Sequence, residues 1–95
     1  MNGAILRDAF NLINGRRQLE YGGPWESFER VALFWGAWMG HPVTAHDVAC
    51  MMALFKLARE AHGHKQDNLL DAAGYIGLAE DLATDEDIQD EGPEQ

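Results

Sequence analysis

Two stretches of the sequence decide the fold class: WESFERVALFWGAWM at residues 25–39 and TAHDVACMMALFKLAREAH at residues 44–62. Apolar residues recur in both at helical intervals, as in Phe28, Val31 and Trp35, so each stretch is predicted to be a helix. Further apolar residues occupy the other faces of both stretches. A helix that is apolar all round needs cover on every side. These stretches are therefore expected to be the two central helices of the fold.

Helical spacing also predicts a helix on either side of this pair, and no alternation typical of a strand occurs. A length of 95 residues corresponds to one domain. We therefore expect an all-α, four-helix bundle-like domain in residues 1–83, with helices at about 3–14, 25–39, 44–62 and 67–83.

Residues that begin or end helices separate these segments. Thr44 and Asp47 have the spacing of a capping box, in which each side chain accepts a hydrogen bond from the other residue's backbone N–H. Gly63 is expected to close the same helix. Gly74 and Gly77 lie inside the last predicted helix, where glycine costs roughly 1 kcal/mol relative to alanine. This cost indicates that another backbone or a ligand approaches closely there.

The chain is acidic, with 16 acidic and 7 basic residues and a net charge of −9. This balance argues against nucleic acid as the main ligand, because phosphate backbones need clustered lysine and arginine. Residues 84–95, TDEDIQDEGPEQ, hold six of the acids and are predicted to be a disordered tail. The tail is interpreted either as a solubility device that makes copies repel one another or as a nucleic-acid mimic that docks on a basic partner.

The compartment is predicted from cysteine usage and hydropathy. The single cysteine, Cys50, cannot form an internal disulfide. No segment resembles a secretory leader or a membrane span of ~20 apolar residues. These features predict a protein of a reducing cytoplasm that has no membrane partner.

The apolar surplus of the two central helices predicts an assembly. Four short helices cannot cover two of their own number on all sides, and large exposed apolar patches mark interaction surfaces. We therefore expect a homo-oligomer, either a dimer or a tetramer; the alternative is that the connector after residue 15 covers the second faces. The expected interface residues are Phe34, Trp35, Trp38, Met51, Met52 and Leu54.

A polar cluster is expected between the last two helices. Lys56 and Arg59 lie three residues apart on one helix, and Asp67, Asp71 and Tyr75 follow at intervals of four on the next. A short connector makes this pair an antiparallel hairpin, so both sets are expected to face one groove. One interpretation is interhelical ion pairing, with the tyrosine hydroxyl bonded to a carboxylate.

The other interpretation of the cluster is a phosphate or nucleotide site. Lys56, Arg59 and Arg17 would hold phosphate oxygens through charge-assisted hydrogen bonds. Tyr21 or a tryptophan would stack on a base. Alternatively, the two aspartates, which lie one turn apart, would hold Mg²⁺ through carboxylate oxygens.

Three motifs match the pattern of one family in order, over residues 4–83. Gly-x-Arg-Gln-x-x-Tyr-Gly is matched by Gly15, Arg17, Gln18, Tyr21 and Gly22. Thr-x-x-Asp-Val-Ala-x-Met-Met-x-x-x-Lys-x-x-Arg is matched by Thr44, Asp47, Val48, Ala49, Met51, Met52, Lys56 and Arg59. Asp-x-x-x-Asp-x-x-Gly-Tyr is matched by Asp67, Asp71, Gly74 and Tyr75. In these motifs the chain resembles a functionally uncharacterised family of tailed bacteriophages and prophages, which implies the bacterial host cytoplasm.

The last motif is also distantly similar to MazG-like nucleoside-triphosphate pyrophosphohydrolases. That resemblance implies an all-α fold, dimers or tetramers, and Mg²⁺ held by a Glu-Glu-x-x-Glu helix and a Glu-x-x-Asp helix. No Glu-Glu-x-x-Glu occurs here, and Glu26 and Glu29 do not replace it, so the balance is against an enzyme.

Three functions remain open, in this order. The first is a phage accessory protein that binds a nucleotide or another phosphate-containing ligand in a helical groove. The second is an acidic counter-defence protein of the anti-CRISPR type, or a regulatory protein, that docks on a host protein. The third is an Mg²⁺-dependent pyrophosphohydrolase.

Overall fold

The computed structural model describes residues 3–14 and 24–84, and this part of the chain forms four α-helices and no strand. The helices are α1 (Ala4–Asn14), α3 (Pro24–Met39), α4 (Ala45–His62) and α5 (Gln66–Leu82). The all-α prediction is confirmed, and every predicted boundary lies within one residue of the observed one. The connector with Arg17 and Tyr21, and the acidic segment from residue 85 onward, lie outside the described residues.

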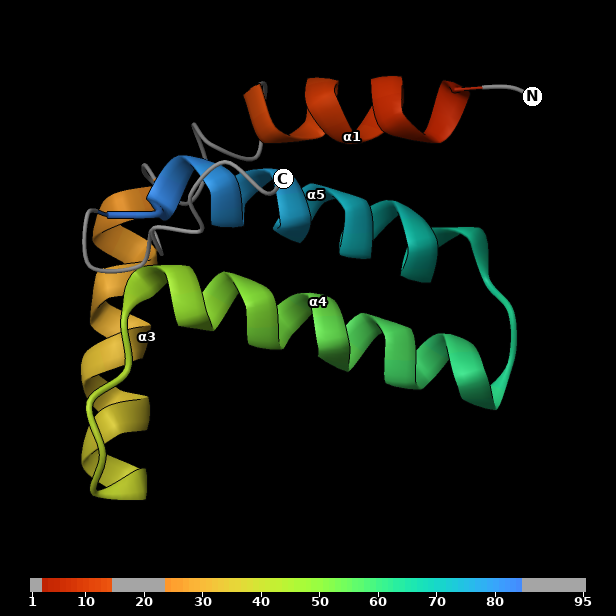
Figure 1. The fold of residues 1–95 in the computed structure, drawn as a ribbon. Helices are drawn as coiled ribbons and strands as arrows, with labels where there is room; N and C mark the ends of the chain where they lie inside the picture. The colour runs from red at the N-terminus through yellow and green to blue at the C-terminus, as the bar shows by residue number, and fades with distance from the viewer. Residues whose placement is uncertain (1–2, 15–23, 85–95) are drawn as a thin grey trace, which may run out of the picture.

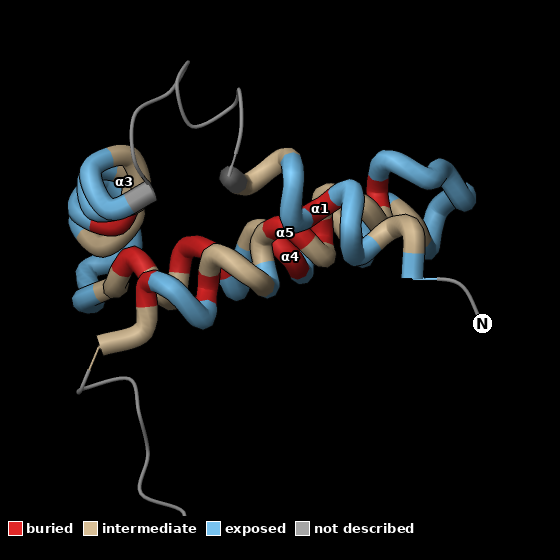
Figure 2. Tube along the Cα trace, turned by 90° about the horizontal axis from the view of Figure 1, so that it is seen from above, coloured by how far each residue is buried: buried red, intermediate tan, exposed pale blue. Residues whose placement is uncertain are grey.

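The helices are arranged as a stack of three with the fourth crossing its end. Helices α1, α5 and α4 lie side by side, with α5 in the middle (Figure 1). Helix α3 crosses one end of this stack, and the view from above shows it nearly end-on (Figure 2). The helices therefore do not share one direction, as those of a regular four-helix bundle do. Beyond α4, on the side away from α5, α3 has no other helix of the described part of the chain beside it, and the segment at residues 40–44 runs back along it (Figure 1).

The buried core is small and lies mainly between α4 and α5. Its main cluster consists of Ala45, Ala49, Ala79 and Leu82, with Phe28 and Leu78 packed against it. Because most of these residues are alanines, the two helix backbones can approach closely, and α4 and α5 have the most extensive contact in the structure. Among the described residues, only Leu82 and Val48 are large side chains that are fully buried. Such a core is modest even for a chain of this length.

Helix α4 has defined ends. The Thr44 hydroxyl accepts a hydrogen bond from the Asp47 N–H at 3.0 Å, and Asp47 Oδ2 accepts one from the Thr44 N–H at 3.1 Å. The predicted capping box is therefore confirmed. At the other end, the Gly63 N–H donates to the Arg59 carbonyl at 3.3 Å, which closes the helix at the predicted residue.

Helix α3 ends in a tight turn. Gly40 has a φ of 67°, a left-handed conformation that L-residues with a side chain rarely adopt. The following N–H, that of His41, donates to the Gly36 carbonyl at 3.1 Å. A Cβ atom on Gly36 would lie only 3.1 Å from the His41 carbonyl oxygen, so glycine lets the chain turn back against the helix.

The two glycines inside α5 face α1. A Cβ atom at Gly77 would lie 3.0 Å from Ile13 Cδ1, and one at Gly74 would lie 3.9 Å from Ile13 Cγ1. A close approach is present, but the approaching group is a side chain of α1 and not the backbone or ligand that was predicted. Because these two residues have no side chain, α1 can pack closely against α5.

None of the helices in the described ranges combines the length and the continuous apolar character that crossing a bilayer requires.

Candidate functional site

The predicted polar cluster contains an ion pair that joins α4 to α5. Lys56 Nζ lies 2.9 Å from Asp71 Oδ2, and the two side chains are 20% and 18% exposed. Partial burial makes such a pair less screened by solvent than a surface pair. The interhelical ion pairing that the residue pattern predicted is therefore present in the hairpin.

Phe55 lies between two cations. Lys56 Nζ is 5.9 Å and Arg59 Cζ is 5.7 Å from the centre of its ring. Both separations fall within the range of cation–π attraction. The ring is 49% exposed, and the Arg59 side chain is exposed as well. Arg59 makes no ion pair with any residue of the described ranges, in contrast to Lys56.

The nearest carboxylate to this arginine in the chain, Glu60, is occupied by the α4–α5 turn. It bonds the His64 ring, accepts from the Lys65 N–H at 3.0 Å, and accepts from the Asn68 amide at 3.4 Å. The hydrogen bond to His64, followed by that to Lys65, lowers the pKa of Glu60 below its ordinary value of 4.5. Glu60 is therefore committed to the α4–α5 turn.

The predicted stripe of Asp67, Asp71 and Tyr75 does not act as one unit. Asp71 pairs with Lys56, whereas Asp67 is exposed in the first turn of α5. The half-buried Tyr75 ring lies 6.2 Å from the ring of Phe28, which comes from α3. In residues 3–14 and 24–84, no three His, Cys, Asp or Glu side chains gather so that they could hold a metal ion. Arg17 and Tyr21 belong to the connector that is not described.

Most of the residues predicted at a subunit interface are exposed. Exposed are Trp38 (91%), Phe34 (71%), Leu54 (64%) and Met51 (38%). Trp35 and Met52 are half-buried. A shallow, open depression of about 270 Å³ lies on the surface of α3, where Arg30, Val31, Phe34 and Trp35 line it.

Two features of this region are not evident from the residue pattern alone. One is the exposed ring of Phe55, because an aromatic residue within an apolar segment is expected to be buried in the core. The other is a contact on α4: His46 Nδ1 donates to the Ala79 carbonyl at 2.7 Å, and its Nε2 lies 3.6 Å from Cys50 Sγ. The carbonyl determines which ring nitrogen carries the hydrogen, so Nε2 accepts from the thiol. In the sequence, this contact could have been predicted only from the spacing of four residues between His46 and Cys50, which places both side chains on one face of a helix.

Comparison with known proteins identifies the family. Residues 4–83 match the model of a domain of unknown function, DUF6378. The chain belongs to this family. It is 43% identical to the gene 55 protein of Mycobacterium phage L5, over 97% of this chain and 61% of that protein. It is 38% identical to the gene 55 protein of Mycobacterium phage D29, over 84% of this chain and 54% of that protein.

These comparisons confirm the resemblance to an uncharacterised phage family. The chain spans between half and two thirds of the length of the two phage proteins. No solved structure matches it.

Proposed function

We propose that this domain is a phage accessory protein that binds a nucleotide, or another phosphate-containing ligand, beside Phe55 and Arg59 on α4. The observation that carries the proposal is the exposed Arg59 guanidinium, which lies 5.7 Å from a half-exposed aromatic ring and has no ion pair in the described part of the chain. An arginine next to an aromatic face supplies both groups that a nucleotide needs.

Each group has a distinct part in the proposed binding. The guanidinium of Arg59 donates two parallel hydrogen bonds to phosphate oxygens, which its planar shape favours. The ring of Phe55 offers a face on which a base stacks. Lys56 stays paired with Asp71, and this ion pair holds the surface of the hairpin in place.

The motif of the Asp67–Tyr75 segment resembles that of MazG-like pyrophosphohydrolases, a likeness that the comparisons with known proteins do not show, and it would imply the same class of ligand. A hydrolase would also need Mg²⁺, for which Asp67 and Asp71 are the candidate ligands. The pairing of Asp71 with Lys56 at 2.9 Å opposes that use. Binding without turnover is therefore proposed, and pyrophosphate release that Asp71→Ala abolishes would instead favour the hydrolase.

Isothermal titration calorimetry with a panel of nucleotides, including cyclic dinucleotides, tests this function. A charge-assisted hydrogen bond is worth about 1.5–3 kcal/mol, so Arg59→Ala should weaken binding roughly tenfold or more. The matched control is Arg7→Ala, because Arg7 is also exposed but lies on α1. Equal losses of affinity in both variants would show that the effect comes from the overall positive charge of the protein and not from the position of Arg59. A folded wild-type protein that gives no heat with any nucleotide refutes the proposal.

A second candidate is a regulatory or counter-defence protein that docks on a host protein. The observation that favours it is the exposed apolar surface of α3, with Trp38 91% exposed. The acidic segment at residues 84–95 would add charge to such a contact. A truncation after residue 83 that leaves partner binding unchanged in affinity and in salt dependence excludes the segment from the mechanism.

A further inference from the structure

The outer face of α4 is apolar along most of the helix. Its members recur at helical spacing: Cys50, Met51, Leu54, Leu57, Ala58 and Ala61. All are exposed, with Leu54 at 64% and Leu57 at 44%. We call this set the outer stripe of α4. It points away from the buried alanines of the core, so no helix among the described residues covers it.

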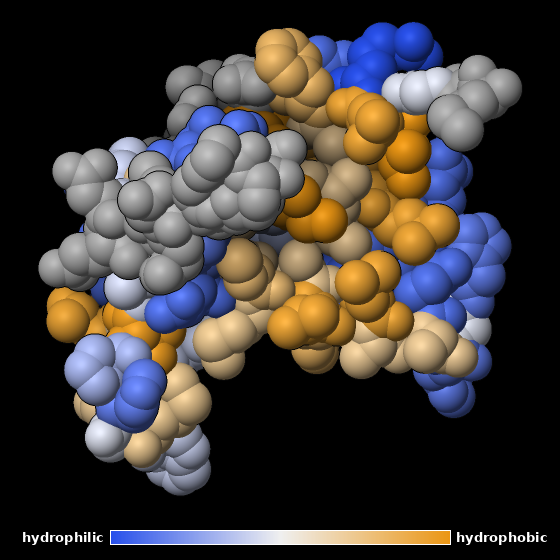
Figure 3. Space-filling view, viewed as in Figure 1, coloured by the Kyte–Doolittle hydropathy of each residue, from blue (hydrophilic) through white to orange (hydrophobic). Residues whose placement is uncertain are grey.

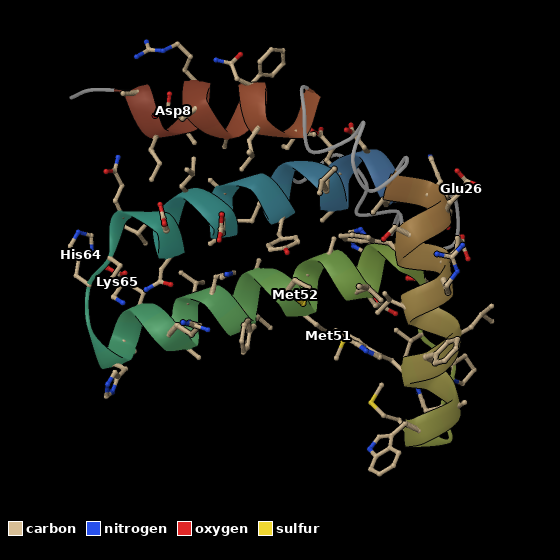
Figure 4. The ribbon with its side chains drawn as sticks, turned by 180° about the vertical axis from the view of Figure 1, so that it is seen from behind. Asp8, Glu26, Met51, Met52, His64 and Lys65 are labelled. Atoms are coloured by element: carbon tan, nitrogen blue, oxygen red, sulfur yellow. The ribbon has the colours of Figure 1, made fainter. Side chains whose placement is uncertain are left out.

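Helix α3 lies beside the outer stripe of α4. Its second half passes beyond α4 on the side away from α5, and the space-filling view shows the angle between the two helices as an open notch (Figure 3). Met51 lies in this angle, below α4 and toward the second half of α3 (Figure 4). That half of α3 is itself apolar, with Phe34 71% and Trp38 91% exposed. Exposed apolar residues thus lie on both of the helices that form this angle, which we call the apolar corner.

The outer stripe carries no formal charge. Of the two acids in α4, Asp47 is part of the capping box and Glu60 is held in the turn. Lys56 pairs with Asp71 on the opposite side of the helix. A strongly charged partner would therefore find nothing complementary here, whereas an identical surface would meet no repulsion despite the net charge of −9.

The apolar area is of the size that a stable dimer needs. An aromatic side chain buries about 150–250 Å², so Phe34 and Trp38 alone expose on the order of 350 Å². The exposed leucines and methionine of the stripe enlarge this surface beyond the roughly 300–600 Å² of the largest patch on a typical monomer. The total approaches the ~800 Å² per partner of a standard protein interface.

We infer that the occupant of this corner is a second copy of the chain, with the two α4 helices antiparallel across a two-fold axis. In this arrangement each outer stripe covers the other, and each α3 flanks the partner subunit's α4. Ala58 and Ala61 let the two helix backbones approach closely. An isologous contact of this kind closes on itself as a dimer. It does not depend on the proposed nucleotide site, because Arg59 lies outside the stripe.

Sedimentation velocity at micromolar concentration tests the dimer. The wild type should sediment at twice its subunit mass of 10.6 kDa, and Leu54→Glu should sediment as a monomer. The matched control is Leu6→Glu, because Leu6 and Leu54 are both 64% exposed but Leu6 lies on α1. This control should remain a dimer, and so should Arg59→Ala, whatever its effect on nucleotide binding.

Circular dichroism of each variant confirms that its helices are intact, and Ala58→Glu replaces Leu54→Glu if the latter does not fold. A wild type that is monomeric at high micromolar concentration overturns the inference. So does a dimer that both Leu54→Glu and Ala58→Glu leave intact, or one that Leu6→Glu dissociates as readily.

Discussion

The α4–α5 hairpin and helix α3 are held in place by different kinds of interaction. The hairpin has a capping box, an ion pair of 2.9 Å, a turn organised by Glu60 and a hydrogen bond of 2.7 Å from His46 to Ala79. Helix α3 is joined to the rest through packing around Phe28, and its second half exposes aromatic residues. Hydrogen bonds and ion pairs fix the position of the hairpin helices at particular residues. The position of α3 depends instead on apolar packing, which acts only where the helix is in contact with other residues.

The sharpest test of this contrast compares two leucines. Leu82→Ala in α5 removes a fully buried side chain and should destabilise the domain by about 2–5 kcal/mol. Leu33→Ala in α3 removes a side chain that is 72% exposed, so a change within about 0.5 kcal/mol is expected. Urea unfolding followed by circular dichroism measures both. Similar losses in the two variants would mean that α3 is buried against something in solution.

A smaller effect is expected at the start of α4. Thr44→Ala removes the hydroxyl that accepts from the Asp47 N–H at 3.0 Å, and the loss of such a cap costs about 1 kcal/mol. Thr44→Ser is the control, because it retains the hydroxyl. Thermal unfolding should rank the wild type and Thr44→Ser together, above Thr44→Ala. If the serine variant were as unstable as the alanine variant, packing of the threonine methyl group would be the dominant contribution.

The smallest effect is expected at the Glu60 turn, where it depends on pH. The pKa of Glu60 is lower in the folded protein than its ordinary value of 4.5, chiefly because of the hydrogen bond to His64. The stability that this carboxylate contributes is therefore present above that value and is lost as the pH falls through the lower folded pKa. Between neutral and acid pH, Glu60→Gln should lose less stability than the wild type. Parallel pH curves for the two proteins would contradict this expectation.

Much of the secondary structure was predictable because its signals are local. Helical spacing, the Thr44–Asp47 pair and Gly63 each act within a few residues, so the helix boundaries and the capping box follow from the residue order. The ion pair of Lys56 with Asp71 was also predictable, since a short connector leaves an antiparallel hairpin as the natural geometry. The crosswise placement of α3 was not, because a helix that is apolar on all sides gives no preferred direction of packing.

The candidate site also combines features that the sequence predicts with features that depend on the fold. The exposure of Phe55 and the occupation of Glu60 by His64, Lys65 and Asn68 depend on how the hairpin closes. Arg59 lies over the Phe55 ring and has no ion pair in the described residues, although the pattern grouped it with Lys56. The glycines of α5 are an intermediate case: their cost predicted a close approach, but only the fold identifies Ile13 as the neighbour.

By itself, the sequence determined that the chain is helical, where each helix starts and stops, and that two of the helices carry apolar residues on more than one face. These properties come from backbone hydrogen bonding and side-chain spacing over one or two turns. Only the tertiary structure decided which apolar residues stay exposed and which charges pair, because those outcomes depend on contacts between residues distant in the chain. The open angle between α3 and α4 is such an outcome.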